Sequence, residues 1–89
     1  MIKCYIVQNV DNPPLGVFKP DKFYIAKISN NNINTFAILD EKQNWVPFNC
    51  RGIAEGLFVY KLYFRIFEGF YVNNKKELNE YIESTKLYN

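Results

Sequence analysis

The stretch LFVYKLYFRIFEGFYV, residues 57–72, is the longest apolar and aromatic run in the chain and decides the fold class. In an extended chain, positions 58, 60, 62, 64 and 66 fall on one face, and positions 59, 61, 63, 65 and 67 fall on the other. This period of two predicts a strand rather than a helix. Glu68 and Gly69 are expected to break it, either as a turn between two strands or as a β-bulge, with residues 70–72 as a short continuation.

Shorter strand-like runs precede this stretch. Tandem prolines at positions 13 and 14 lack backbone donors and fix φ, so they predict a loop after the first run. Three asparagines, residues 30–32, predict a hairpin tip because Asn tolerates the left-handed conformation. Pro47 marks the fourth run as an edge strand or a bulge. The predicted strands are Ile2 to Val10, Lys22 to Ser29, Thr35 to Leu39 and Trp45 to Phe48.

The C-terminal segment has the signature of a short helix. Asn74 is a capping residue, and Glu77 stands three positions later, as in a capping box. Leu78, Tyr81 and Ile82 follow at i, i+3 and i+4 and form one apolar stripe. The sequence therefore predicts a helix from Lys75 to Ser84 or Thr85 that packs on the sheet.

These elements together predict an α+β fold. Short antiparallel strands at close spacing indicate a small, strongly bent antiparallel sheet or a small barrel of five to six strands, with one C-terminal α-helix. The 89 residues are expected to form a single β-rich domain. Residues 1–72 would hold the sheet or barrel, and residues 73–89 the helix and tail.

The composition argues against catalysis. The chain has no histidine, the residue most often used for acid/base chemistry, so neither a Ser-His-Asp nor a Cys-His arrangement exists. Cys4 and Cys50, its only cysteines, lie in apolar runs and are expected to be buried free thiols in a reducing cytoplasm. No signal peptide is visible, and no apolar run approaches the ~20 residues of a membrane span. The sequence predicts a cytoplasmic protein without enzyme activity, cofactor, metal site or membrane contact.

The region from Gly16 to Phe48 carries a resemblance. It contains FYIAKI at residues 23–28, FAILDE at 36–41 and WVPF at 45–48. A strand ending in an Asp-Glu turn before a Trp-x-x-Phe strand resembles small SH3-like barrel proteins encoded by bacteriophages, and the abundance of Asn, Lys, Ile and Tyr fits an AT-rich genome. The resemblance implies a protein of the bacterial host's cytoplasm that serves host takeover or anti-defence.

Five residues are the candidate partner-binding residues: Trp45, Arg51, Lys61, Tyr63 and Arg65. Lys61, Tyr63 and Arg65 are expected on one face of the predicted strand. Tyr and Arg are favoured at interface hot spots, whereas cations around an aromatic ring also suit stacked bases and phosphates. The plain alternative for this trio is a solvated strand face with one half-buried Tyr. For Trp45 the alternative is a lid over the core.

The function predicted first is that of an inhibitor, anti-CRISPR-like, that binds a host protein by contact alone. The alternatives are a nucleic-acid-binding barrel that uses Lys61, Tyr63, Arg65 and Lys27, and a structural or assembly protein of a phage. The net charge of +2 gives the nucleic-acid alternative little support. Because the stretch from Leu57 to Phe67 is apolar on both faces, it is also expected to contribute to a homodimer or a heteromeric interface. Asp40 and Glu41 are expected to organise a turn and not to form an acidic site.

Overall fold

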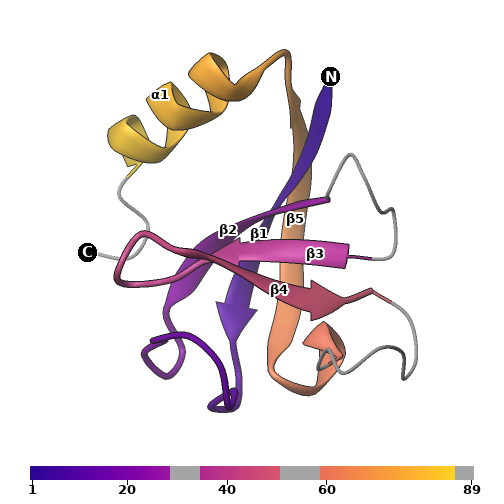
Figure 1. The fold of residues 1–89 in the computed structure, drawn as a ribbon, viewed down its shortest axis with the longest axis vertical. Coiled ribbons are helices and arrows are strands. Elements are labelled where there is room, and N and C mark those ends of the chain that lie inside the picture. Colours follow the sequence, from indigo (N-terminus) through magenta and orange to yellow (C-terminus); the bar gives the residue numbers. More distant parts are fainter. Residues whose placement is uncertain (29–34, 51–58, 86–89) are drawn as a thin grey trace.

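The structure, a computed structural model, describes residues 1–28, 35–50 and 59–85 (Figure 1). These residues form five strands, one short 3₁₀ turn and one α-helix. In chain order they are β1 (Ile2–Asn9), β2 (Phe23–Ile28), β3 (Thr35–Leu39), β4 (Trp45–Asn49), η1 (Tyr60–Leu62), β5 (Phe64–Val72) and α1 (Lys75–Thr85).

The five strands form one antiparallel sheet in the order β4-β3-β2-β1-β5. Strands β1 to β4 follow one another as a meander, and β5 returns to pair with the other side of β1. The prediction of a small antiparallel sheet with one C-terminal helix is confirmed. Within the described residues β4 and β5 remain two separate edges, so the sheet is not closed into a barrel.

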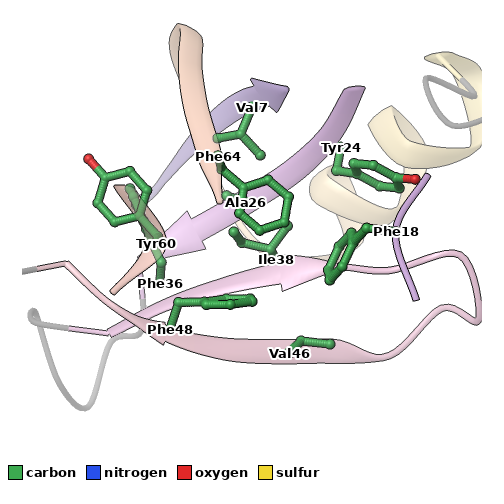
Figure 2. Close-up of a cluster of buried hydrophobic side chains, with 10 residues drawn as sticks. All are labelled: Val7, Phe18, Tyr24, Ala26, Phe36, Ile38, Val46, Phe48, Tyr60 and Phe64. Carbon is green, nitrogen blue, oxygen red and sulfur yellow. The ribbon is translucent and has the colours of Figure 1, made fainter. Parts of the chain in front are cut away.

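Each face of the sheet carries its own core. One face holds an aromatic core in which the Phe18 ring lies 4.9 Å from the rings of both Tyr24 and Phe64 (Figure 2). The buried residues of this core are Val7, Phe18, Tyr24, Ala26, Phe36, Ile38, Val46, Phe48, Tyr60 and Phe64. The other face packs against the helix through Ile2, Cys4, Ile25, Leu39, Val72, Leu78 and Ile82. We call this second side the helix-bearing face.

The terminal helix is as predicted. It runs from Lys75 to Thr85, and the Glu77 N–H donates to Asn74 Oδ1 at 2.9 Å, which is the expected N-terminal cap. Leu78 and Ile82 are buried, and the half-buried Tyr81 ring lies 4.5 Å from that of Phe70. The helix therefore covers one end of the sheet, near the start of β1 and the end of β5 (Figure 1).

The predicted strand over residues 57–72 is wrong in its first part. Residues 57 and 58 lie outside the described residues, and Tyr60–Leu62 form a 3₁₀ turn in which the Tyr63 N–H donates to the Tyr60 carbonyl at 2.9 Å. The turn buries the Tyr60 ring against Phe36, at 4.4 Å between centroids, and leaves Leu62 in solvent. A strand would have placed Tyr60 and Leu62 on the same face, so burial of the larger ring overrides the alternation.

The turn between β3 and β4 is organised by Asp40, as predicted. Its buried carboxylate accepts the N–H groups of Lys42 and Asn44 at Oδ1, both at 2.9 Å, and that of Val17 at Oδ2 at 3.0 Å. A carboxylate that accepts three backbone N–H groups fixes both the turn and the loop beside it. Pro47 lies in β4 at one edge of the sheet, which confirms the predicted edge strand.

Candidate functional site: the exposed strand β5

Strand β5 is the longest strand and lies at an edge of the sheet. Only Phe64 and Val72, its two end residues, are buried. Among the exposed residues between them are three large apolar side chains: Ile66, Phe67 and Tyr71, with 39, 65 and 59% of their surface accessible. Proteins usually protect a long edge strand, so an exposed one with aromatic side chains is a candidate surface for contact with another molecule.

The opposite edge of the sheet is protected. Strand β4 has only five residues, and Pro47 at its centre has no N–H to offer to a further strand. Three of its residues, Val46, Phe48 and Asn49, are buried. The two edges therefore differ: β4 is short and carries a proline, whereas β5 is long and exposes apolar side chains.

A β-bulge divides β5. Ile66 lies opposite Val7 and Glu68 lies opposite Ile6, so Phe67 is the extra residue of the bulge. The bulge was one of the two interruptions predicted near Glu68 and Gly69, and it falls one residue earlier. Strand β5 continues through it to Val72 without a turn.

Phe67 lies on the helix-bearing face, where it contacts Phe23. Arg65 and Phe23 both lie opposite Gln8, so all three share this face. The Phe67 ring lies 5.3 Å from the Phe23 ring in an edge-to-face arrangement, and Arg65 Nη2 donates to Gln8 Oε1 at 2.7 Å. The result is an aromatic pair next to a charged side chain on an exposed part of the sheet.

The other face of β5 presents Ile66 and Tyr71. Tyr71 lies opposite Lys3, whose Nζ is 4.2 Å from the Tyr71 ring centroid and 5.2 Å from that of Tyr5. These are cation–π distances. Gly69, opposite Tyr5, leaves room for this arrangement, because a Cβ atom there would approach Lys3 Nζ to 3.0 Å. An apolar side chain and a lysine held between two tyrosines thus line this side of the strand.

The structure separates the predicted trio Lys61, Tyr63 and Arg65. Lys61 lies in the 3₁₀ turn, Tyr63 follows that turn, and only Arg65 lies in β5. Lys61 is exposed, whereas half-buried Tyr63 packs against the aromatic core with its ring 6.4 Å from that of Phe48. The expectation that the three residues alternate on one strand face is therefore wrong, because the chain is not extended before Phe64.

Of the two other predicted residues, the structure describes Trp45 but not Arg51. Trp45 is half-buried against the core under the helix, and Lys27 Nζ lies 4.3 Å from its ring centroid. This position agrees with the reading of Trp45 as a lid over the core. Arg51 lies outside the described residues, so its proposed role stays a prediction.

Sequence reasoning did not name Phe23, Ile66, Phe67 or Tyr71 as surface residues. For Ile66, Phe67 and Tyr71 the signal was the apolar surplus of the stretch from Leu57 to Val72, which indicated an interface without saying which side chains form it. Their arrangement depends on β5 lying at the edge of the sheet, which the order of residues does not show, and on a bulge that the sequence predicted only as one of two possible interruptions.

Among the described titratable residues, the clear pKa shifts are caused mainly by burial. Burial raises the pKa of the Cys4 thiol to about 11, which keeps it protonated and unreactive near neutral pH. Cys50 also forms no disulfide, but it is half-buried and not fully buried as expected. Within residues 1–28, 35–50 and 59–85, no three acidic or cysteine side chains gather in the manner of a metal site.

No protein-family model, curated protein or solved structure matches this chain significantly. Among the described segments, no helix has both the length and the apolar character needed to cross a membrane.

Proposed function

We propose that this chain acts by binding another protein along β5, without catalysis. The observation that carries the proposal is the exposure of Ile66, Phe67 and Tyr71 on a nine-residue edge strand. An edge strand offers main-chain donors and acceptors to an added strand, and its side chains provide specificity on either face. Tyrosine is a common anchor in such contacts.

The partner is proposed to contact the side of β5 that carries Ile66 and Tyr71. Lys3 already lies against the Tyr71 ring, so this tyrosine is held in place before a partner arrives. Less side-chain freedom is then lost on binding, which favours affinity. Gly69, between these two anchors, has no side chain and so leaves room for Lys3 and the Tyr5 ring to pack over the strand.

The role we propose for this contact is the one implied by the resemblance to small phage-encoded SH3-like barrels: inhibition of a host protein, as in anti-defence factors. The support is the sequence resemblance itself, whose three segments lie in β2, in β3 and its following turn, and in β4. A fold can host many functions, so the partner must be found by experiment.

A nucleic-acid partner is less well supported by the geometry. Lys61 and Tyr63 lie before β5 and not on a common strand face with Arg65, and Lys27 lies over the Trp45 ring. The residues predicted for this role therefore do not form a platform of aromatic rings and cations on one accessible surface.

Affinity purification from bacterial lysate tests the proposal with three baits. These are the wild-type chain, an Ile66→Ser/Tyr71→Ser variant, and a Leu62→Ser control whose altered residue is as exposed but precedes β5. We expect the same partner with wild type and control, and at least about tenfold less with the double variant.

A partner captured equally by all three baits would contradict binding along β5. Nuclease treatment of the lysate and a salt titration separate the nucleic-acid alternative. Retention through nucleic acid is lost on digestion and falls steeply with salt, whereas an apolar protein contact persists.

A further inference from the structure

The bulge in β5 gathers three side chains of different character on the helix-bearing face. In a regular strand Arg65 and Phe67 would share a face and Glu68 would point to the opposite one. Here Glu68 lies opposite Ile6, which shares its face with Gln8, the residue opposite Arg65. The extra residue at the bulge therefore places a cation, an aromatic ring and an anion in a row on one surface.

We call this surface the bulge patch and define it by Gln8, Phe23, Arg65, Phe67 and Glu68. Phe67 is its most protruding apolar residue, with 65% of its surface exposed, and the half-buried Phe23 ring supports it from β2. Arg65 is held by its bond to Gln8. Neither Arg65 nor Glu68 forms an ion pair with another described residue.

The patch occupies the part of the helix-bearing face that α1 leaves open. The helix packs at the other end of this face, where Leu78 and Ile82 contact the core and Tyr81 lies against Phe70. Beyond Phe70 the same face continues through Glu68, Phe67 and Arg65, all of which are exposed.

We propose that a second copy of this chain covers the bulge patch. Along β5 the patch presents a cation, an aromatic ring and an anion in that order. In a second copy that runs in the opposite direction, the anion faces the cation of the first copy and the two rings face each other. A two-fold axis through Phe67 brings Arg65 of one copy to Glu68 of the other, and the symmetry makes this pair twice. The two Phe67 rings meet near the axis, where they exclude water from each other.

The contact is small, so the association is weak. A stable interface buries about 800 Å² on each partner, more than one row of side chains provides. The dimer is therefore reversible and depends on concentration. This inference goes beyond the proposed function, because Ile66 and Tyr71 lie on the other face of β5 and remain accessible in the dimer.

Sedimentation equilibrium of the purified chain, from micromolar to about 1 mM, tests the inference. We expect a monomer–dimer equilibrium in wild type and at least about tenfold weaker association in Phe67→Ser. Leu62→Ser is the matched control, since Leu62 is equally exposed but lies outside the patch, and it should associate like wild type. A strict monomer across this range, or equal association of both variants, overturns the proposal while leaving binding by Ile66 and Tyr71 intact.

Charge reversal tests the geometry of the pair. Arg65→Glu and Glu68→Arg should each weaken self-association about tenfold, because each change acts twice across the axis. The two variants mixed should associate with each other, and the double variant should recover the dimer. Lys42→Glu, on the β3–β4 turn, is the charge control. Circular dichroism checks that all variants are folded. If neither the mixture nor the double variant then recovers the association, the proposed pairing is overturned.

Discussion

The hydroxyl of Tyr24 donates a hydrogen bond of 2.6 Å to the Glu41 carboxylate and accepts the Lys19 N–H at 2.7 Å. Lys19 Nζ in turn lies 3.7 Å from Glu41. The buried ring of Tyr24 thus carries a polar tip that joins the loop before β2 to the turn after β3. This link complements Asp40, which binds the same loop through the Val17 N–H.

We expect Tyr24→Phe to reduce the free energy of unfolding by about 1–2 kcal/mol at pH 7, because the Lys19 N–H and Glu41 lose a partner in a largely dry site. Urea denaturation measures the change. Tyr71→Phe, at an exposed ring, is the control and should have little effect.

The same pair predicts a pH dependence. Burial and the bond to Glu41 raise the pKa of Tyr24 above its ordinary value of 10.0. A raised pKa in the folded state stabilises the fold fully below pH 10, and this contribution is lost as the pH rises from there through the folded-state pKa. The gap in stability between wild type and Tyr24→Phe should therefore narrow above pH 10. A constant gap would show that the hydroxyl does not ionise differently on folding.

Gly16→Ala should be strongly destabilising. Gly16 has φ of +79°, and a Cβ atom there would lie 2.6 Å from the Phe18 ring and 2.9 Å from Val46. Left-handed strain and overpacking together cost about 2–4 kcal/mol, measurable by thermal or urea denaturation. The control is Gly69→Ala, which meets the flexible end of Lys3 and the Tyr5 ring at 3.0 and 3.2 Å, and should cost less. The reverse ranking would contradict the geometry of the loop before β2.

Asn74→Ala should destabilise the fold by about 1 kcal/mol, because it removes the acceptor for the Glu77 N–H at the start of α1. Asn79→Ala, at an exposed position inside the helix, is the control. It should be neutral or slightly stabilising, since Ala has the higher helix propensity. An equal loss of unfolding free energy in the two variants would show that the Asn74 side chain does not stabilise the start of α1.

Cys4 should react with thiol reagents only after unfolding. With its pKa raised to about 11 from 9.0, its thiolate fraction near pH 8 is about 100-fold lower than in an unfolded chain, and burial blocks access as well. In a Cys50→Ser variant, labelling by an aromatic disulfide should follow the urea unfolding curve. Rapid labelling without denaturant would place Cys4 at an accessible surface.

The elements that the sequence predicted best are those defined by local chemistry. The cap at Asn74 and the stripe through Leu78 and Ile82 fixed the helix, and Pro47 marked β4 as an edge. Each of these signals depends on neighbours a few positions away, so they can be read without knowledge of the fold.

The prediction that Lys61, Tyr63 and Arg65 share one strand face was wrong because it did not depend on near neighbours alone. That arrangement depended on an extended chain from residue 57, and the burial of Tyr60 against Phe36 turned that segment into a 3₁₀ turn. This contact joins residues far apart in the sequence, which periodicity over a short window does not detect.

Local sequence patterns were enough to predict an antiparallel sheet with one terminal helix, and an apolar surplus in residues 57–72. Which of these side chains meet solvent depends on the three-dimensional pairing of the strands. Pairing with β1 on one side alone left β5 at the edge, and the extra residue Phe67 brought Glu68 to the face of Arg65. Side-chain direction in a strand alternates with each residue, so a single bulge, set by long-range pairing, changes which side chains share a surface.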